Sequence, residues 1–199
     1  MKHSLLCTCD KSFDVTVPDT IRLTAEVMNS IVDNSFMNYT CPFCAHVTAT
    51  DFFCTLKNDS GEQLYFIPEP ERFSFFNGTL NIPDNQPVVI GFPELKERIL
   101  LLQHNLDYVA IESLKILICQ KAAASMDCNR FDVMFHHIDG DILIFHIQGI
   151  KQDEVAVIKL PIAMYEDIKE TLIKERHNPP YSLLFTKGYC SVKNIDFGD

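Results

Sequence analysis

Four cysteines in two close pairs, Cys7-Thr8-Cys9 and Cys41-Pro42-Phe43-Cys44, constrain this chain more than any other feature. Two short thiol pairs about thirty residues apart suit one tetrahedral zinc ion, which binds four deprotonated sulfurs. Each pair adjoins a segment in which apolar and polar residues alternate. Such segments are typical of a zinc ribbon, in which β-hairpins present the two cysteine-bearing loops, or knuckles. The spacing therefore predicts a structural zinc ion bound by Cys7, Cys9, Cys41 and Cys44.

Other interpretations of the two pairs stay open. Cys-Pro-Phe-Cys is also a dithiol motif of glutaredoxin-like redox proteins, in which the first cysteine begins a helix whose dipole lowers its pKa. The residues after Cys44 alternate and include β-branched side chains, which favours a strand, and a redox role for Cys41 and Cys44 leaves the first pair unexplained. The four cysteines could also be plain structural thiols. Further candidate ligands are His3, His46 and Cys54.

The composition describes a folded protein without a basic surface. The chain has 199 residues, of which 47% are hydrophobic, enough to form the core of one large or two small domains. Its formal net charge is −10, shared evenly between residues 1–75 and the rest. Because no Lys/Arg cluster is present, we expect no nucleic-acid partner held by phosphate neutralisation. A protein partner or self-association fits this composition better.

The cysteines and the length of the apolar stretches indicate the cellular compartment in which we expect the protein. Residues 1–6 are too short for a signal peptide, and the longest apolar stretch, around Ile116, is far below the ~20 residues of a membrane span. The remaining cysteines are scattered through apolar or strand-like segments: Cys54, Cys119, Cys128 and Cys190. We therefore expect reduced thiols and a cytoplasmic protein rather than a disulfide framework in a secreted one.

Residues 1–70 are expected to form the zinc-ribbon-like module. Strands are predicted over 13–17, 47–54 and 63–67, the last two joined by a turn at Asn58-Asp59-Ser60-Gly61. A short helix is predicted over 24–33 with Thr24 as its N-cap. Residues 71–92 are rich in proline and glycine but also contain phenylalanines, so we expect a connector that packs on the body of the protein.

Residues 93–199 are expected to combine helices with an antiparallel sheet, which makes the whole chain α+β. Helices are predicted over 93–105, 107–125 and 161–176, and the second is apolar around most of its circumference, as in a core or a dimer interface. Asp139-Gly140 predicts a hairpin between strands 131–138 and 141–148, and further strands are predicted over 155–160 and 189–195.

Three histidines lie in the predicted hairpin. With Asp139-Gly140 as the loop, His137 and His146 share one face but stand about two residue pairs apart, too far for a common ion. His136 falls on the more apolar face. We therefore predict structural roles for all three. The sequence shows no Gly-rich phosphate loop and no motif of a serine hydrolase or zinc protease, so we expect a non-enzymatic protein.

The cysteine motifs and their surroundings resemble one known family. Phe13-Asp14-Val15-Thr16-Val17, Tyr39-Thr40-Cys41-Pro42-Phe43-Cys44 and Leu64-Tyr65-Phe66-Ile67-Pro68-Glu69-Pro70 are similar to the CpXC-domain family, bacterial and archaeal proteins with two Cys-Pro-X-Cys motifs and no established activity. Similar runs follow around Glu94-Leu95, Ile111-Glu112 and Tyr165-Glu166. The resemblance implies that Cys9, Cys41 and Cys44 are zinc ligands.

The chain departs from that family's pattern at both knuckles. The first motif is Cys-Thr-Cys, so Cys7 would have to reach the ion from a shifted place. The glycine that usually follows each knuckle is replaced by Asp10 and Ala45. Glycine adopts a positive φ readily, Asp moderately and Ala poorly. These departures therefore predict a metal site that is weaker than a four-thiolate ribbon, or that is lost.

Overall fold

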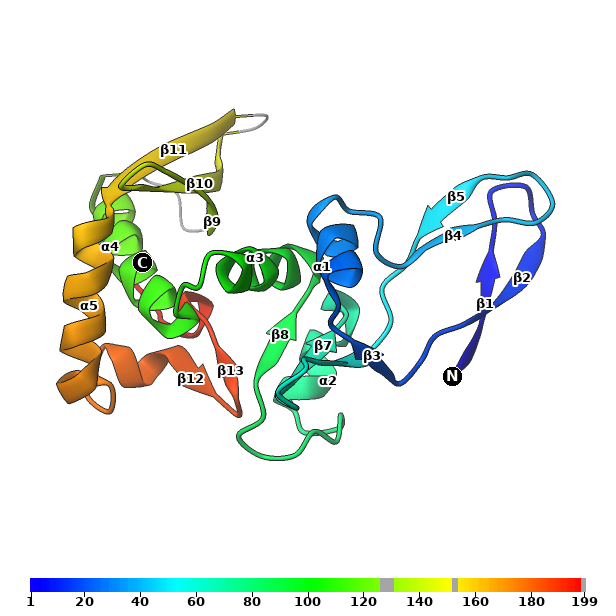
Figure 1. Ribbon diagram of the computed structural model, residues 1–199, viewed down its shortest axis with the longest axis horizontal. Coiled ribbons are helices and arrows are strands. Elements are labelled where there is room, and N and C mark those ends of the chain that lie inside the picture. Colours follow the sequence, from blue (N-terminus) through cyan, green and yellow to red (C-terminus); the bar gives the residue numbers. More distant parts are fainter. Residues whose placement is uncertain (126–130, 152–153, 198–199) are drawn as a thin grey trace. The chain divides into compact units, whose positions relative to one another are not determined.

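The structure is a computed structural model that describes residues 1–125, 131–151 and 154–197 (Figure 1). Its helices and strands form an α+β fold, as predicted. The chain divides into two compact units, residues 1–99 and 100–199. Cys128 lies outside the described residues.

The first unit begins with two small hairpins that carry the knuckles. Strand β1 (Lys2–Leu6) pairs antiparallel with β2 (Ser12–Thr16), and β4 (Asn38–Thr40) pairs antiparallel with β5 (Val47–Ala49). Helix α1 (Ala25–Val32) lies between them in sequence, and the Thr24 hydroxyl accepts a hydrogen bond from the Val27 N–H, as expected of its N-cap. The hairpins appear in blue and cyan in Figure 1.

The rest of the first unit is built around a mixed sheet. Its strands β3 (Thr20–Arg22), β6 (Cys54–Lys57), β7 (Gln63–Ile67) and β8 (Val88–Ile90) are joined by parallel β3–β6, antiparallel β6–β7 and parallel β7–β8 pairings. The core packs on this sheet and contains Val17, Ile31, Met37, Cys54, Leu56, Phe66, Val89, Leu95 and Ile99. The fully buried residues of this core come from outside the two hairpins, although Val15 of β2 and Tyr39 of β4 pack against it.

The prediction of one strand over residues 47–54 is wrong. Residues 47–54 do not form a single strand, because β5 ends at Ala49 and β6 begins at Cys54 in a different sheet. Phe52 lies in the break, where its ring packs 4.0 Å from the ring of His3 and its N–H points to the sulfur of Met37. The aromatic contact anchors the loop where the alternating pattern alone would continue the strand.

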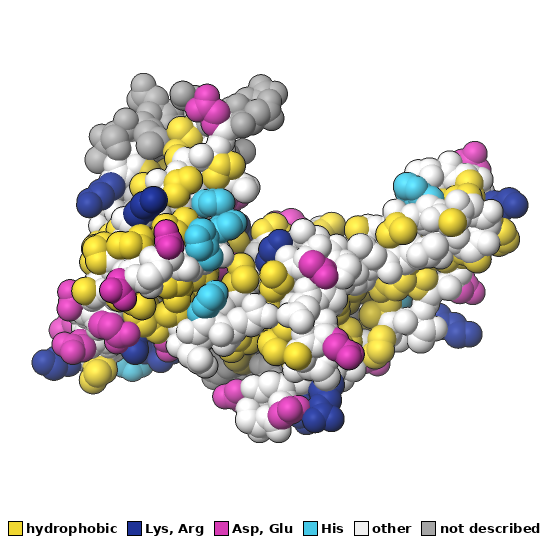
Figure 2. All heavy atoms as spheres, turned by 45° about the horizontal axis from the view of Figure 1, so that its top comes forward, with side chains coloured by type: hydrophobic (Ala, Val, Ile, Leu, Met, Phe, Trp, Pro, Cys, Tyr) yellow, Lys and Arg dark blue, Asp and Glu magenta, His cyan; other side chains and the backbone are white. Residues whose placement is uncertain are grey.

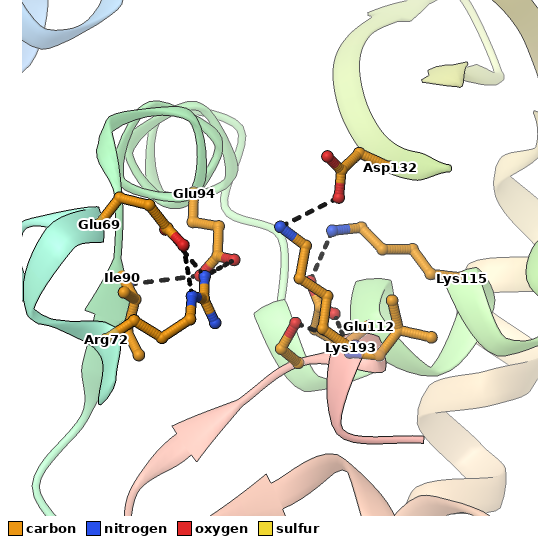
Figure 3. A network of polar contacts seen from close by, with 10 residues as sticks. Glu69, Arg72, Ile90, Glu94, Glu112, Lys115, Asp132 and Lys193 are labelled. Carbon is orange, nitrogen blue, oxygen red and sulfur yellow. Dashed lines mark hydrogen bonds and ion pairs between the residues drawn. The ribbon is translucent and has the colours of Figure 1, made fainter. Parts of the chain in front are cut away.

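The segment 71–92 contains short elements rather than a free linker. A 3₁₀ turn (Glu69–Glu71) leads into α2 (Arg72–Phe76), and β8 follows later in the segment. Phe75 is buried, whereas Phe73 is exposed. Arg72 lies between the carboxylates of Glu69 and Glu94, while Glu94 also accepts the Ile90 N–H (Figure 3).

The second unit packs helices against a three-stranded antiparallel sheet. The sheet order is β11 (Glu154–Pro161), β10 (Ile142–Lys151), β9 (Asp132–Asp139). Helix α3 (Phe92–Gln103) leads into this unit, followed by α4 (Tyr108–Ser125) and α5 (Ile162–Glu175). The Asp107 carboxylate accepts the Ala110 N–H at the start of α4, which confirms Asp107 as a cap. Helix α4 is largely buried, as its apolar circumference predicted.

The strand predicted over residues 189–195 is much shorter in the structure. The predicted strand 189–195 is only β13 (Tyr189–Cys190), which pairs with β12 (Phe185–Thr186) after a 3₁₀ turn at Tyr181–Leu184. Ser191 then caps a further 3₁₀ turn, Val192–Asn194, through its hydroxyl. A local side-chain cap thus competes with strand extension.

A buried ion pair connects α4 to this last turn. Lys115 Nζ lies 2.6 Å from one Glu112 carboxylate oxygen, and the other oxygen accepts the Val192 N–H at 2.7 Å (Figure 3). Both side chains are buried. Lys193 pairs with Asp132 nearby.

Candidate metal centre

The two knuckles have closely similar backbones although their cysteine spacings differ. In the first, the Cys7 N–H donates to the Lys11 carbonyl and the Asp10 N–H to the Cys7 carbonyl. In the second, the Cys41 N–H donates to the His46 carbonyl and the Ala45 N–H to the Cys41 carbonyl. The first loop is thus the second loop shortened by one residue. This shortening is how Cys-Thr-Cys serves in place of a four-residue motif.

The knuckles bring all four sulfur atoms together. The Sγ atoms of Cys7, Cys9, Cys41 and Cys44 lie within 4.8 Å of one another. The Cys7 and Cys44 sulfurs are 3.5 Å apart, and those of Cys9 and Cys41 are 3.9 Å apart. Four thiolates at zinc's usual 2.3 Å would stand about 3.8 Å apart at the corners of a tetrahedron. The cluster therefore has the size and donor set to hold a metal ion.

Burial is unequal within each pair. Cys7 and Cys41, the first cysteine of each knuckle, are 3% and 1% exposed, whereas Cys9 is partly exposed and Cys44 is exposed. The first cysteine anchors each knuckle to its hairpin, and the second closes the cluster from the solvent side. An ion at the centre would be surrounded by four sulfurs.

The residue after each cysteine pair has the positive φ that glycine, the usual residue of the family at this place, adopts readily. Asp10 has φ 63° and Ala45 has φ 60°. This left-handed backbone is unfavourable for alanine because its Cβ crowds the following carbonyl oxygen. Both positions thus keep the backbone that glycine would adopt, although neither is glycine. The knuckle turns are retained despite the absence of glycine.

The protonation of the cluster shows why a cation suits it. A hydrogen bond from the Cys9 N–H is the largest cause that lowers the pKa of Cys7 to about 6. Contacts with the other three sulfurs lower it further, while burial acts in the opposite direction. For Cys44 the His46 N–H lowers the pKa, but the neighbouring sulfurs and burial outweigh it and raise the pKa to about 12. Sulfurs this close cannot all be thiolates unless a positive charge lies among them.

The further ligand candidates lie elsewhere. Cys54 is fully buried in the core of the first unit, where burial, followed by the nearby Asp51 carboxylate, raises its pKa to about 12. The His3 ring packs on Phe52. His46 contributes its backbone to the second knuckle, and its side chain is not part of the four-sulfur group.

The surroundings of Cys44 bear on the redox interpretation. The element that follows the Cys-Pro-Phe-Cys motif is strand β5, as the alternating pattern predicted, so Cys41 does not lie at a helix N-terminus. The helix dipole that activates glutaredoxin-like cysteines is therefore missing from this motif. The 3.5 Å contact between the Cys7 and Cys44 sulfurs also joins the two knuckles, so Cys44 does not face Cys41 alone.

The prediction that His136 lies on the opposite face of the hairpin from His146 is wrong. The loop of the β9–β10 hairpin is Gly140-Asp141, and the register shifts between Ile144 and Phe145, which leaves His136 as an extra residue in β9. The His136 ring stacks on His146 with centroids 4.0 Å apart, and it also contacts His137. The sequence placed His137 and His146 on one face, and a β-bulge, invisible to strict alternation, brings His136 to that face as well.

Strand β1 is an element of the site that sequence reasoning missed. Lys2–Leu6 forms one side of the first knuckle's hairpin, with His3 and Leu5 less exposed than Lys2, Ser4 and Leu6. The residue types do not show this alternation, because Leu6 is apolar but 71% exposed, so the segment gives little strand signal.

The comparisons with known proteins agree with the geometry. Residues 5–115 match the CpXC protein family. This match covers more than half of the chain, both knuckles and the mixed sheet. The chain therefore belongs to the CpXC family.

A full-length relative is also known. The chain is 26% identical to an uncharacterised protein of Treponema pallidum (strain Nichols) over 217 aligned positions, which cover 96% of this chain and 97% of the relative. The similarity thus extends through the second unit. No solved structure matches the chain.

Proposed function

We propose that the four-cysteine cluster holds a structural zinc ion and that the protein is a non-enzymatic interaction or scaffold module. The observation that carries the proposal is the convergence of four sulfurs from two hairpins within 4.8 Å. Four-thiolate coordination leaves no open position for a substrate or water, which is the arrangement of structural zinc sites.

The construction of the first unit supports a structural role for the ion. The two hairpins are short and supply only partly buried side chains, such as Val15 and Tyr39, to the core on the mixed sheet. Two-stranded hairpins are marginally stable alone in water. A zinc ion that joins both knuckles would supply the stabilisation that apolar burial does not, because metal binding free energy becomes folding free energy.

Exposed apolar side chains on the knuckle hairpins support an interaction role. Leu6, Phe43 and Val47 are 71%, 55% and 53% exposed. They flank the cysteines in sequence, and the Lys11 ammonium lies 4.8 Å from the centre of the Phe43 ring. A rigid, metal-fixed loop that presents an aromatic side chain suits contact with a protein partner or a second copy of this chain.

The charge of the molecule is compatible with a protein partner. On the face in Figure 2, Lys/Arg and Asp/Glu side chains are interspersed rather than gathered by sign. With a net charge of −10, we do not propose nucleic acid as a partner. No helix within the described ranges has the length and apolarity needed to cross a membrane. The seven cysteines that the structure describes are free thiols, which supports the proposal of a reducing, cytoplasmic location.

Metal analysis of the purified protein tests the proposal. We expect one zinc per chain in the native protein and its loss in Cys41→Ala, together with a loss of folded structure in the first unit. Cys119→Ala is the matched control, because it removes a buried thiol from the second unit and should leave the zinc content unchanged. A wild-type protein that is fully folded without metal would overturn the structural role.

A further inference from the structure

Three imidazoles gather on the outer face of the β9–β11 sheet. The opposite face is formed by core residues such as Val133, Phe135 and Phe145. On the outer face, Met134, His146 and Val157 are paired across the three strands. Figure 2 shows a group of histidine side chains on the surface turned toward the viewer.

The bulge at His136 is what creates the group. Successive residues of a regular strand point to opposite faces, so His136 and His137 would normally be separated by the sheet. Here Phe135 pairs with Phe145 and His137 pairs with Ile144, so the register shifts by one residue at His136. Both rings consequently reach the same side, where their centroids are 4.8 Å apart.

Two ring nitrogens lie within hydrogen-bond distance of each other. The Nδ1 atoms of His136 and His137 are 2.6 Å apart. Two imidazole nitrogens bound to one zinc-sized ion at about 2.0–2.1 Å stand about 3.3 Å apart in tetrahedral geometry. A small opening of the pair is therefore enough to admit an ion. Both side chains are exposed, so an ion can enter from solvent.

His146 holds one of the two rings in place. Its ring lies parallel to that of His136, with an interplanar angle of 23° and centroids 4.0 Å apart. In this stacked arrangement His146 supports the orientation of His136 rather than pointing a nitrogen at the same spot. We assign it as a positioning residue.

We propose that His136 and His137 form a second metal site, independent of the cysteine cluster, that binds one borderline divalent transition-metal ion with water completing its coordination. Neutral imidazoles favour zinc, nickel and copper over magnesium or calcium. The imidazole donor set is harder than the four thiolates in the first unit, and it accepts nickel and copper as well as zinc. This inference does not rest on the proposed function of the cysteine cluster.

Titration of the zinc-loaded, full-length protein with Ni²⁺ tests this site by calorimetry. We expect one Ni²⁺ per chain, without release of zinc and without a thiolate-to-nickel charge-transfer absorption. His136→Gln and His137→Gln should each weaken Ni²⁺ binding by roughly tenfold or more. The remaining imidazole would then bind the ion alone, without the high effective concentration of a second, linked imidazole. His177→Gln, at an exposed position on the segment after α5, is the matched control and should bind as wild type.

Several outcomes would overturn the site. These are an absence of saturable Ni²⁺ binding, unchanged affinity in both bulge variants, or an equal loss in His177→Gln. Displacement of zinc by Ni²⁺ would place the ion at the thiolates instead. His146→Phe keeps a ring stacked on His136 and should retain binding. Loss of binding in that variant would contradict its assignment as a positioning residue. Circular dichroism of each variant checks that the sheet is intact.

Discussion

Asp10 and Ala45 occupy equivalent places in the two knuckles, each directly after the second cysteine of its pair and each with a left-handed backbone, φ 63° and 60°. Their N–H groups both donate to the carbonyl of the first cysteine in the same knuckle. The turn that closes the cluster is therefore retained although neither residue is glycine. Backbone geometry, rather than the residue type, is what the two knuckles have in common.

Ala45→Gly should stabilise the zinc-loaded protein. Alanine in the left-handed region costs roughly 1–2 kcal/mol, while glycine costs about 0.5–1 kcal/mol more chain entropy on folding. The net gain should be about 1 kcal/mol or less, measured by urea unfolding or by competition with a zinc chelator. Asp10→Gly is the matched variant and should gain less, since Asp tolerates this backbone better. Destabilisation by Ala45→Gly would contradict the strain at that turn.

The buried thiols Cys54 and Cys119 should report separately on the two units. Burial is the first cause that raises the pKa of Cys54 to about 12 and that of Cys119 to about 11. Both therefore stay protonated and unreactive toward a thiol reagent at pH 8 in the native protein. After chelation, Cys54 should react because the first unit loses its metal support, while Cys119 in the second unit should stay protected. Mass spectrometry of the alkylated peptides reads out each site.

These two thiols also predict a pH dependence. A thiol whose pKa is raised on folding favours the folded state below its unfolded pKa of about 9, and that contribution is lost as the pH rises through 11 to 12. We expect stability to fall between pH 9 and 12, and Cys119→Ala to reduce the pH dependence of the second unit. The free energy of unfolding measured across this range is the check. An unchanged slope in the variant would contradict the role of Cys119.

Removing one charge of the buried Glu112–Lys115 pair should destabilise the protein more than removing both charges. Glu112→Gln keeps an acceptor for the Val192 N–H but removes a negative charge beside the buried Lys115 ammonium, which should cost about 3–5 kcal/mol. The double variant Glu112→Gln/Lys115→Met removes both charges and should recover most of that loss. Denaturant unfolding of the single and double variants gives the coupling. Equal destabilisation of both would show that the charge is not the cause.

Much of the fold could be predicted because its signals are local. Thr24 and Asp107 are N-caps whose side chains accept hydrogen bonds within one turn, and the apolar circumference of α4 predicted its burial. The four-cysteine cluster was also predictable, since zinc-type spacing depends on short loops alone. Local chemistry of this kind can be recognised in a single sequence.

The rest depends on contacts between distant residues. The bulge at His136 is set by pairing with β10, so alternation in β9 could not show it. The break after Ala49 depends on Phe52 meeting His3 from the other hairpin. Each involves a register or ring contact that tertiary structure decides.

Zinc stoichiometry combined with refolding in the presence and absence of a chelator tests the central claim most directly. We predict one zinc per chain in the native protein, and refolding of the first unit only when zinc is supplied, followed by the protection of Cys54. A protein that contains no stoichiometric metal, refolds fully with chelator present and keeps Cys54 protected would contradict the account.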